Sequence, residues 1–136
     1  MADVICGQAL LSFLTLEQML LNNSFLCLYE VAHVPTTADT AGDYTTIECT
    51  FPGYARIPIN PWSAPVLLGG VTANTNYPPQ SFTLTAAGGP FPVYGYFLLD
   101  ALLNLIGAGQ NPAAPVLLAN AGDQYQVTPD FNQFNG

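Results

Sequence analysis

The chain has 136 residues, nine acidic side chains, a single arginine and a formal net charge of −8. Nucleic-acid backbones and anionic membrane surfaces are bound by several basic side chains, so this composition argues against both as partners. Charged residues make up 7% of the chain, against about a quarter in ordinary globular proteins. We therefore expect a polar, weakly charged surface suited to assembly with other proteins.

In chain order, the first predicted element is an α-helix over residues 8–21, rich in leucine and ended by Asn22 and Asn23. Short runs of apolar and β-branched residues follow, separated by turn residues. A helical turn is expected over 102–106, and the tail 129–136 is polar apart from two phenylalanines. The predicted strands cover residues 24–32, 44–51, 54–59, 65–71, 80–86, 93–99 (the most hydrophobic, hence central), 115–119 and 124–128.

The spacing of these runs predicts the fold class. Twelve glycines and twelve prolines punctuate the chain, and such residues end strands and break helices. We predict a mainly-β protein, an antiparallel β-sandwich or jelly-roll-like barrel with one N-terminal α-helix. The length predicts a single domain over residues 1–136.

Three cysteines, Cys6, Cys27 and Cys49, form an odd set without metal-ligand spacing. We expect buried free thiols, and one disulfide with a leftover thiol remains the alternative. The N-terminal stretch lacks the positive start of a signal peptide, and no apolar run is long enough to span a bilayer.

No sequence motif of a nucleophile elbow, phosphate-binding loop or zinc protease is present, and no cofactor or metal is expected. Three weaker catalytic or metal-binding arrangements stay open. They are a Cys27–His33 dyad, a Glu30–Glu48 carboxylate pair for glycoside hydrolysis, and a loop with Asp39 and Asp43 that loosely resembles a calcium site.

Arg56 is the only strong cation, and a desolvated guanidinium needs a partner. Asp100 is the first choice for an intrachain ion pair and Glu48 the second, while a contact across a subunit interface is the alternative. Several aromatic residues could be interface anchors, although a core role is the alternative for each, and Trp62 and Tyr77 lie in proline- and asparagine-rich loops. The candidate interface residues are Trp62, Tyr77, Phe131 and Phe134.

The order of segments resembles a diffuse family of small tailed-bacteriophage virion proteins, of the capsid-decoration or tail-fibre type. The likeness rests on short motifs in order: the N-terminal Leu-rich stretch, FLCLY, GYAR (residues 53–56), SFT, VYGYFLLDA (residues 93–101) and AGDQYQVTP. The chain departs from the family pattern in its proline content and in the loop 60–79.

The resemblance implies a virion protein without catalysis. We expect a decoration (cement) protein made in the host bacterial cytoplasm and placed on the capsid exterior. Its partners would be the major capsid protein and copies of itself, as a dimer or trimer. The first alternative is a tail, baseplate or fibre-associated module that contacts a host receptor, and the second is a polysaccharide hydrolase.

Overall fold

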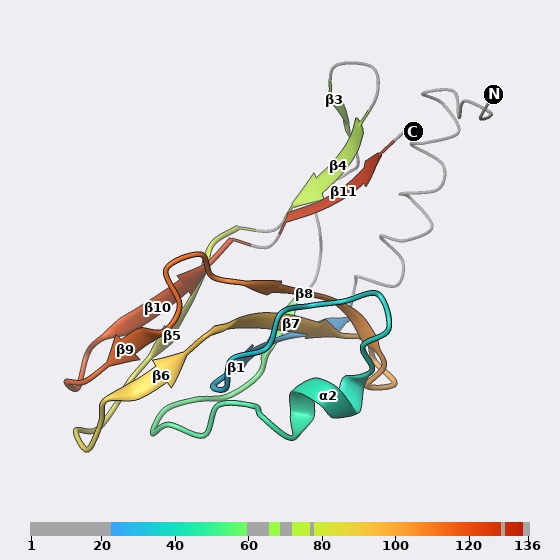
Figure 1. Ribbon diagram of the computed structural model, residues 1–136. Helices are drawn as coiled ribbons and strands as arrows, with labels where there is room; N and C mark the ends of the chain where they lie inside the picture. Colours follow the sequence, from blue (N-terminus) through green and yellow to red (C-terminus); the bar gives the residue numbers. More distant parts are fainter. Residues whose placement is uncertain (1–22, 60–65, 69–71, 77, 129, 135–136) are drawn as a thin grey trace.

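The computed structural model describes residues 23–59, 66–68, 72–76, 78–128 and 130–134. The predicted helix over 8–21, together with Cys6, Trp62 and Tyr77, lies outside these residues. The described chain is mainly β, with antiparallel strands and one short helix, which confirms the predicted fold class (Figure 1).

The central layer is a four-stranded antiparallel sheet in the order β2-β1-β7-β8. It consists of β1 (Ser24–Tyr29), β2 (Ile57–Ile59), β7 (Gly95–Leu99) and β8 (Leu105–Gln110). The hydrophobic run around residues 93–99 does supply an interior strand, β7, between β1 and β8. Both β1 and β7 are apolar at nearly every position, which is the pattern of strands covered on both faces.

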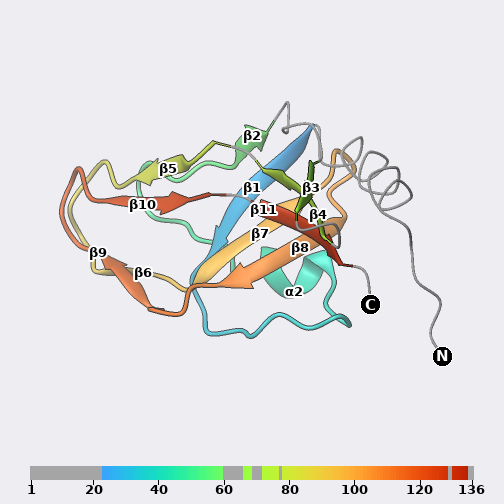
Figure 2. The same ribbon diagram turned by 90° about the horizontal axis from the view of Figure 1, so that it is seen from above.

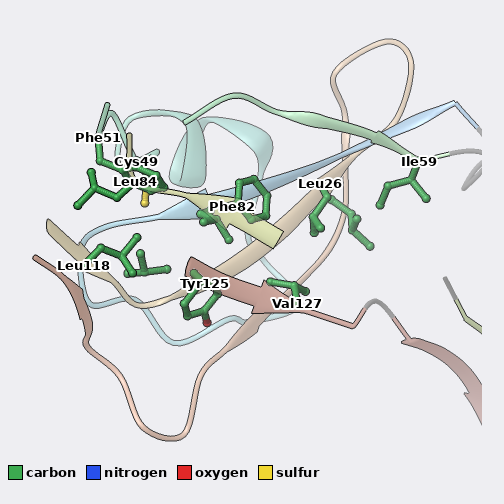
Figure 3. Close-up of a cluster of buried hydrophobic side chains, with 12 residues drawn as sticks. Leu26, Cys49, Phe51, Ile59, Phe82, Leu84, Leu118, Tyr125 and Val127 are labelled. Atoms are coloured by element: carbon green, nitrogen blue, oxygen red, sulfur yellow. The ribbon is translucent and has the colours of Figure 1, made fainter. Parts of the chain in front are cut away.

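One face of this sheet packs on a second β layer (Figures 1 and 2). That layer contains two antiparallel pairs, β5 (Gln80–Thr83) with β10 (Gln124–Val127), and β6 (Phe91–Val93) with β9 (Val116–Leu118). Alternate residues of β1 and β7 meet it in one cluster, so the two layers share a core as in a β-sandwich. The buried members of the cluster, most of them labelled in Figure 3, are Leu26, Leu28, Cys49, Phe51, Ile59, Phe82, Leu84, Val93, Leu98, Leu118, Tyr125 and Val127.

The opposite face is covered by α2 (Ala41–Thr45) and its flanking loops. Tyr44 of α2 is fully buried and stacks on Phe97 of β7, with 5.3 Å between ring centroids. The buried cluster on this side is Cys27, Tyr29, Tyr44, Phe97 and Leu99. The alternation along β1 and β7 thus divides their side chains between two cores.

The predicted strand over 44–51 is wrong. Asp43 accepts hydrogen bonds from the Thr40 backbone N–H (2.8 Å) and hydroxyl (3.2 Å), which favours a helix start here. Within 44–51, only Glu48 forms a β-bridge, an isolated one with Tyr29.

Two further predictions from the sequence are corrected. The expected helical turn over 102–106 is instead a tight turn that leads into β8, with Leu103 at a φ of 65°. The stretch 130–134, expected as polar tail, forms strand β11 (Asp130–Phe134).

The strands β3 (Val66–Leu68), β4 (Thr72–Asn76) and β11 form a three-stranded sheet in the order β11-β4-β3. We call this sheet the arm, because it extends beyond the body at the end away from β9 (Figure 1). The arm continues the β5–β10 ribbon, since β4 precedes β5 and β11 follows β10 in the chain. The last pair of the arm is Asn76 with Asp130, and the first pair of the ribbon is Gln80 with Val127. Three residues therefore lie between β4 and β5, and two lie between β10 and β11.

Candidate functional site

One polar cluster of the described chain surrounds Glu48 and contains the arginine of the chain. Its carboxylate accepts two hydrogen bonds from Arg56, from Nε at 2.9 Å and from Nη2 at 2.8 Å. The Tyr54 hydroxyl donates to the same carboxylate. The Glu48 side chain is 14% exposed and that of Arg56 33%, so the pair is shielded on the carboxylate side.

The local sequence explains how these groups meet. β2 pairs with β1 only at residues 24–26, and further along β1 the Leu28 carbonyl accepts from the Cys49 N–H at 2.9 Å. The Leu28 N–H donates to the Tyr54 hydroxyl at 3.2 Å. Tyr54 reaches this position through the turn at Gly53, whose φ of 90° suits glycine and whose added Cβ would lie 2.5 Å from the Thr83 carbonyl oxygen.

The electrostatics of this group are those of a structural clamp. Burial and the bond to Glu48 raise the pKa of Tyr54 well above its usual range. The same carboxylate raises the pKa of Arg56, so that guanidinium remains charged. Both carboxylate oxygens of Glu48 are occupied by Arg56 and Tyr54, so this geometry does not support Glu48 as a catalytic carboxylate paired with Glu30.

The first choice of partner for Arg56 is wrong, because Arg56 binds Glu48 and not Asp100. Asp100 instead closes the turn between β7 and β8, accepting from the N–H groups of Leu102 (2.8 Å) and Asn104 (2.9 Å). These backbone donors lower the pKa of Asp100. Aspartate side chains readily bond to nearby backbone N–H groups. Asp100 therefore serves the turn between β7 and β8, and Glu48 remains as the partner of Arg56.

A second polar cluster joins the loop before α2 to the buried face of β1. Asp39 Oδ2 accepts from the Thr36 N–H (2.9 Å) and the Tyr44 hydroxyl (2.7 Å), and it lies 2.9 Å from His33 Nε2. These hydrogen bonds, led by the backbone N–H of Thr36, hold the pKa of Asp39 well below its usual range. The carbonyl of His33 also accepts from the Tyr29 hydroxyl at 2.9 Å.

The structure argues against two arrangements that the sequence left open, the calcium loop with Asp39 and Asp43 and the Cys27–His33 dyad. The carboxylates of Asp39 and Asp43 are both engaged by protein donors, which leaves them poorly suited to calcium. Over the described residues, no group of three or more His, Cys, Asp or Glu side chains is placed to hold a metal. Burial raises the pKa of Cys27 to about 12, which is opposite to what a nucleophilic thiol in a Cys27–His33 dyad requires.

Cys27 and Cys49 are buried free thiols, so within the described residues the prediction for these two is confirmed. In the same part of the chain, no helix is long and apolar enough to cross a membrane. Of the candidate interface residues, Phe131 and Phe134 lie on β11 in the arm, where Phe131 pairs with Thr75 and Phe134 with Thr72 in the register.

Two shallow grooves mark the surface of the body. The larger has a volume of about 320 Å³ and runs beside Arg56, between the segment 53–58 and β5. The other, of about 260 Å³, lies between the end of β8 and β10. We call it the β8–β10 groove. Sequence analysis did not identify it, because its walls come from segments about 15 residues apart with no shared motif.

Comparison with known proteins gives no family. No family model, no curated protein and no solved structure matches the chain.

Proposed function

We propose that this protein is a non-catalytic structural component of a tailed-bacteriophage virion, and specifically a capsid decoration protein. It binds the outer surface of the head and bridges neighbouring major capsid proteins, and it associates with its own copies. The proposal builds on the sequence resemblance carried by the GYAR and VYGYFLLDA motifs and on the arm.

The arm is the observation that carries the proposal. In the described chain, β11 and β3 are the outer strands of the arm, each paired on one side only. Outer strands of soluble proteins are commonly protected by charged side chains, proline or a bulge, and β11 (DFNQF) contains no lysine and no proline and has one charged residue, Asp130, at its first position. A strand edge of this kind binds a partner strand by backbone hydrogen bonding, which suits a module that attaches to a protein lattice.

The charge distribution supports an outward position. A chain with a net charge of −8 is repelled by packaged DNA but tolerated on the outside of a shell. Many identical weak contacts on a lattice add up to stable attachment, so the arm of a single copy needs only a modest affinity.

The experiment is a copy-number measurement on purified heads that lack the protein. We expect saturation at hundreds of copies per head and an increase in the thermal stability of the heads. Phe131→Asp in β11 should reduce binding at least tenfold, because it places a charge on the arm. The matched control is Leu117→Asp, which alters a 54% exposed leucine of β9 at the opposite end of the molecule (Figure 1). A handful of copies per head, or equal losses in both variants, would refute the proposal.

A tail or fibre-associated module that contacts a host receptor is the second candidate. The β8–β10 groove favours it, because a receptor-binding protein needs a recessed surface with free polar groups. The two candidates are separated by copy number, since a tail part is present in a few to dozens of copies. The polysaccharide-hydrolase alternative has less support, because Arg56 holds Glu48; hydrolysis that is lost in a folded Glu48→Gln variant would revive it.

A further inference from the structure

The β8–β10 groove combines aromatic and uncharged polar side chains from three strands. Tyr96 comes from β7, Gln110 ends β8, and Gln126 projects from β10. None of its described lining residues is charged. They are Tyr96, Gly109, Gln110, Asn111, Pro112, Tyr125, Gln126, Val127 and Thr128.

One wall of the groove is held rigidly. Tyr96 is the register partner of Gly109, and a Cβ on that glycine would lie 2.8 Å from the tyrosine ring, so the ring lies directly against the strand. Asn111 accepts from the Ala113 N–H at 2.8 Å and donates to the Tyr125 hydroxyl at 3.0 Å. Its amide is therefore fixed in place, and the wall is preorganised before any ligand arrives.

The two glutamine side chains of the groove are uncommitted. Within the described chain, the side-chain amides of Gln110 and Gln126 form no hydrogen bond with protein. Each amide offers two donors and one acceptor oxygen, and the two stand on different strands that border the groove. This arrangement matches a ligand that carries several adjacent hydroxyl groups, each able to donate and accept.

The charge of the molecule narrows the class of ligand. An anion would be repelled by a chain of net charge −8, and the groove lining offers it no guanidinium or ammonium. A cation would find no carboxylate among the described lining residues. A neutral ligand with one apolar face and several hydroxyls fits both the aromatic walls and the amides.

We infer that the β8–β10 groove binds a neutral carbohydrate, with the C–H face of a sugar ring against Tyr96 and its hydroxyls bonded to Gln110 and Gln126. The inference goes beyond the decoration role and does not depend on it. A decoration protein that binds no sugar, and a sugar-binding protein that does not attach to heads, give different results in the two experiments.

The test is a titration of the ¹⁵N-labelled full chain, followed by the backbone amide shifts, with maltotetraose, cellotetraose, chitotriose and mannotriose as neutral probes. Oligogalacturonate is the anionic control, because it keeps the ring hydroxyls and carries a carboxylate in place of each C6 hydroxymethyl group. At millimolar concentrations, at least one neutral probe should shift the amides of residues 109–111 and 125–128. Oligogalacturonate should shift them at least tenfold less.

The matched variants are single glutamine substitutions. Gln110→Ala and Gln126→Ala should each weaken binding about fivefold, the effect of one lost hydrogen bond. Gln124→Ala is the control, since Gln124 is an exposed residue of the same strand β10 but lies outside the groove. The spectrum of each variant reports directly whether it is folded. The inference is overturned if no neutral probe shifts the groove residues, if the shifts lie elsewhere, or if both groove variants bind as well as Gln124→Ala.

Discussion

Tyr54→Phe tests the clamp around Glu48 with the least disturbance to packing. The substitution removes one hydroxyl and keeps the ring, so the stacking on Phe82, at 5.8 Å between ring centroids, is retained. What is lost is the acceptor for the Leu28 N–H and one donor to Glu48. The substitution therefore isolates the contribution of the Tyr54 hydroxyl oxygen to stability.

The magnitude follows from the burial of the groups left behind. Leu28 is fully buried, and its N–H donates to the Tyr54 hydroxyl and not to β7, so removal of the hydroxyl leaves this N–H without its partner. An unsatisfied buried N–H costs about 1–3 kcal/mol, and a lost hydrogen bond to a carboxylate about 1.5 kcal/mol. Glu48 keeps both hydrogen bonds to Arg56, which offsets part of the cost of losing the bond from Tyr54. We expect Tyr54→Phe to lower the free energy of unfolding by about 3 kcal/mol.

The assay is urea denaturation at neutral pH, and Tyr125→Phe is the control. Tyr125 is also buried, at 6% exposed, but its hydroxyl accepts from the side-chain amide of Asn111 and not from the backbone. Its loss should cost about 1 kcal/mol. Faster hydrogen exchange at the Leu28 amide in Tyr54→Phe gives an independent readout. Equal losses of stability in the two variants, with unchanged exchange at Leu28, would refute the reasoning.

Three further predictions concern other polar groups. In double-mutant cycles followed by urea denaturation, Arg56→Ala should couple with Glu48→Gln by about 1 kcal/mol, whereas Arg56→Ala and Asp100→Asn should be additive; the reverse pattern would restore the pairing first expected. Asp39 has a lowered pKa in the folded state, so its stabilising effect is present above the unfolded value of about 3.9 and declines as the pH falls below it. The stability difference between wild type and Asp39→Asn should therefore be constant from pH 5 to 8 and shrink in more acidic solution, and a difference that grows with acid would contradict this. In a Cys6→Ser background, the two buried thiols, whose pKa values are raised to about 12, should react with a thiol reagent at pH 8 only after denaturation; rapid labelling of the native protein would exclude their burial.

The strongly hydrophobic segments were predictable from the sequence because burial determines their structure. β1 and β7 are apolar on both faces, and no alternative to an interior strand accommodates them. The turn at Gly53 was equally clear, since a proline–glycine pair has few other conformations.

The segments that the sequence did not predict correctly are those where polar side chains decide between two local structures. Residues 44–51 alternate like a strand, but Asp43 binds the backbone of Thr40 and favours the helix α2. β8 contains two glycines and has low intrinsic strand propensity, so its place beside β7 depends on tertiary pairing. The choice of Glu48 over Asp100 as the partner of Arg56 likewise depends on which acid lies near, a property of the folded chain.

The arm and the β8–β10 groove could not be predicted for a related reason. The arm needs the pairing of β4 with β11, which are far apart in sequence, and the groove needs β7, β8 and β10 to lie together; neither has a local motif. Asn74 of β4 pairs with Asn132 of β11 in the register, and nothing in either segment indicates the other.

The continuity of the arm with the β5–β10 ribbon also has a consequence for how the chain folds during synthesis. Thr83 and Gln124, which are paired in the ribbon, are 41 residues apart, and Thr75 and Phe131, which are paired in the arm, are further apart still. Such non-local pairings form slowly, and until β10 is made β5 has no strand to complete its ladder. An arrested chain that ends before residue 124 therefore exposes a free β5 edge, and unpaired strands of this kind aggregate. The ladders of the ribbon and of the β4–β11 pair are thus completed only when the last strands of the fold have been made.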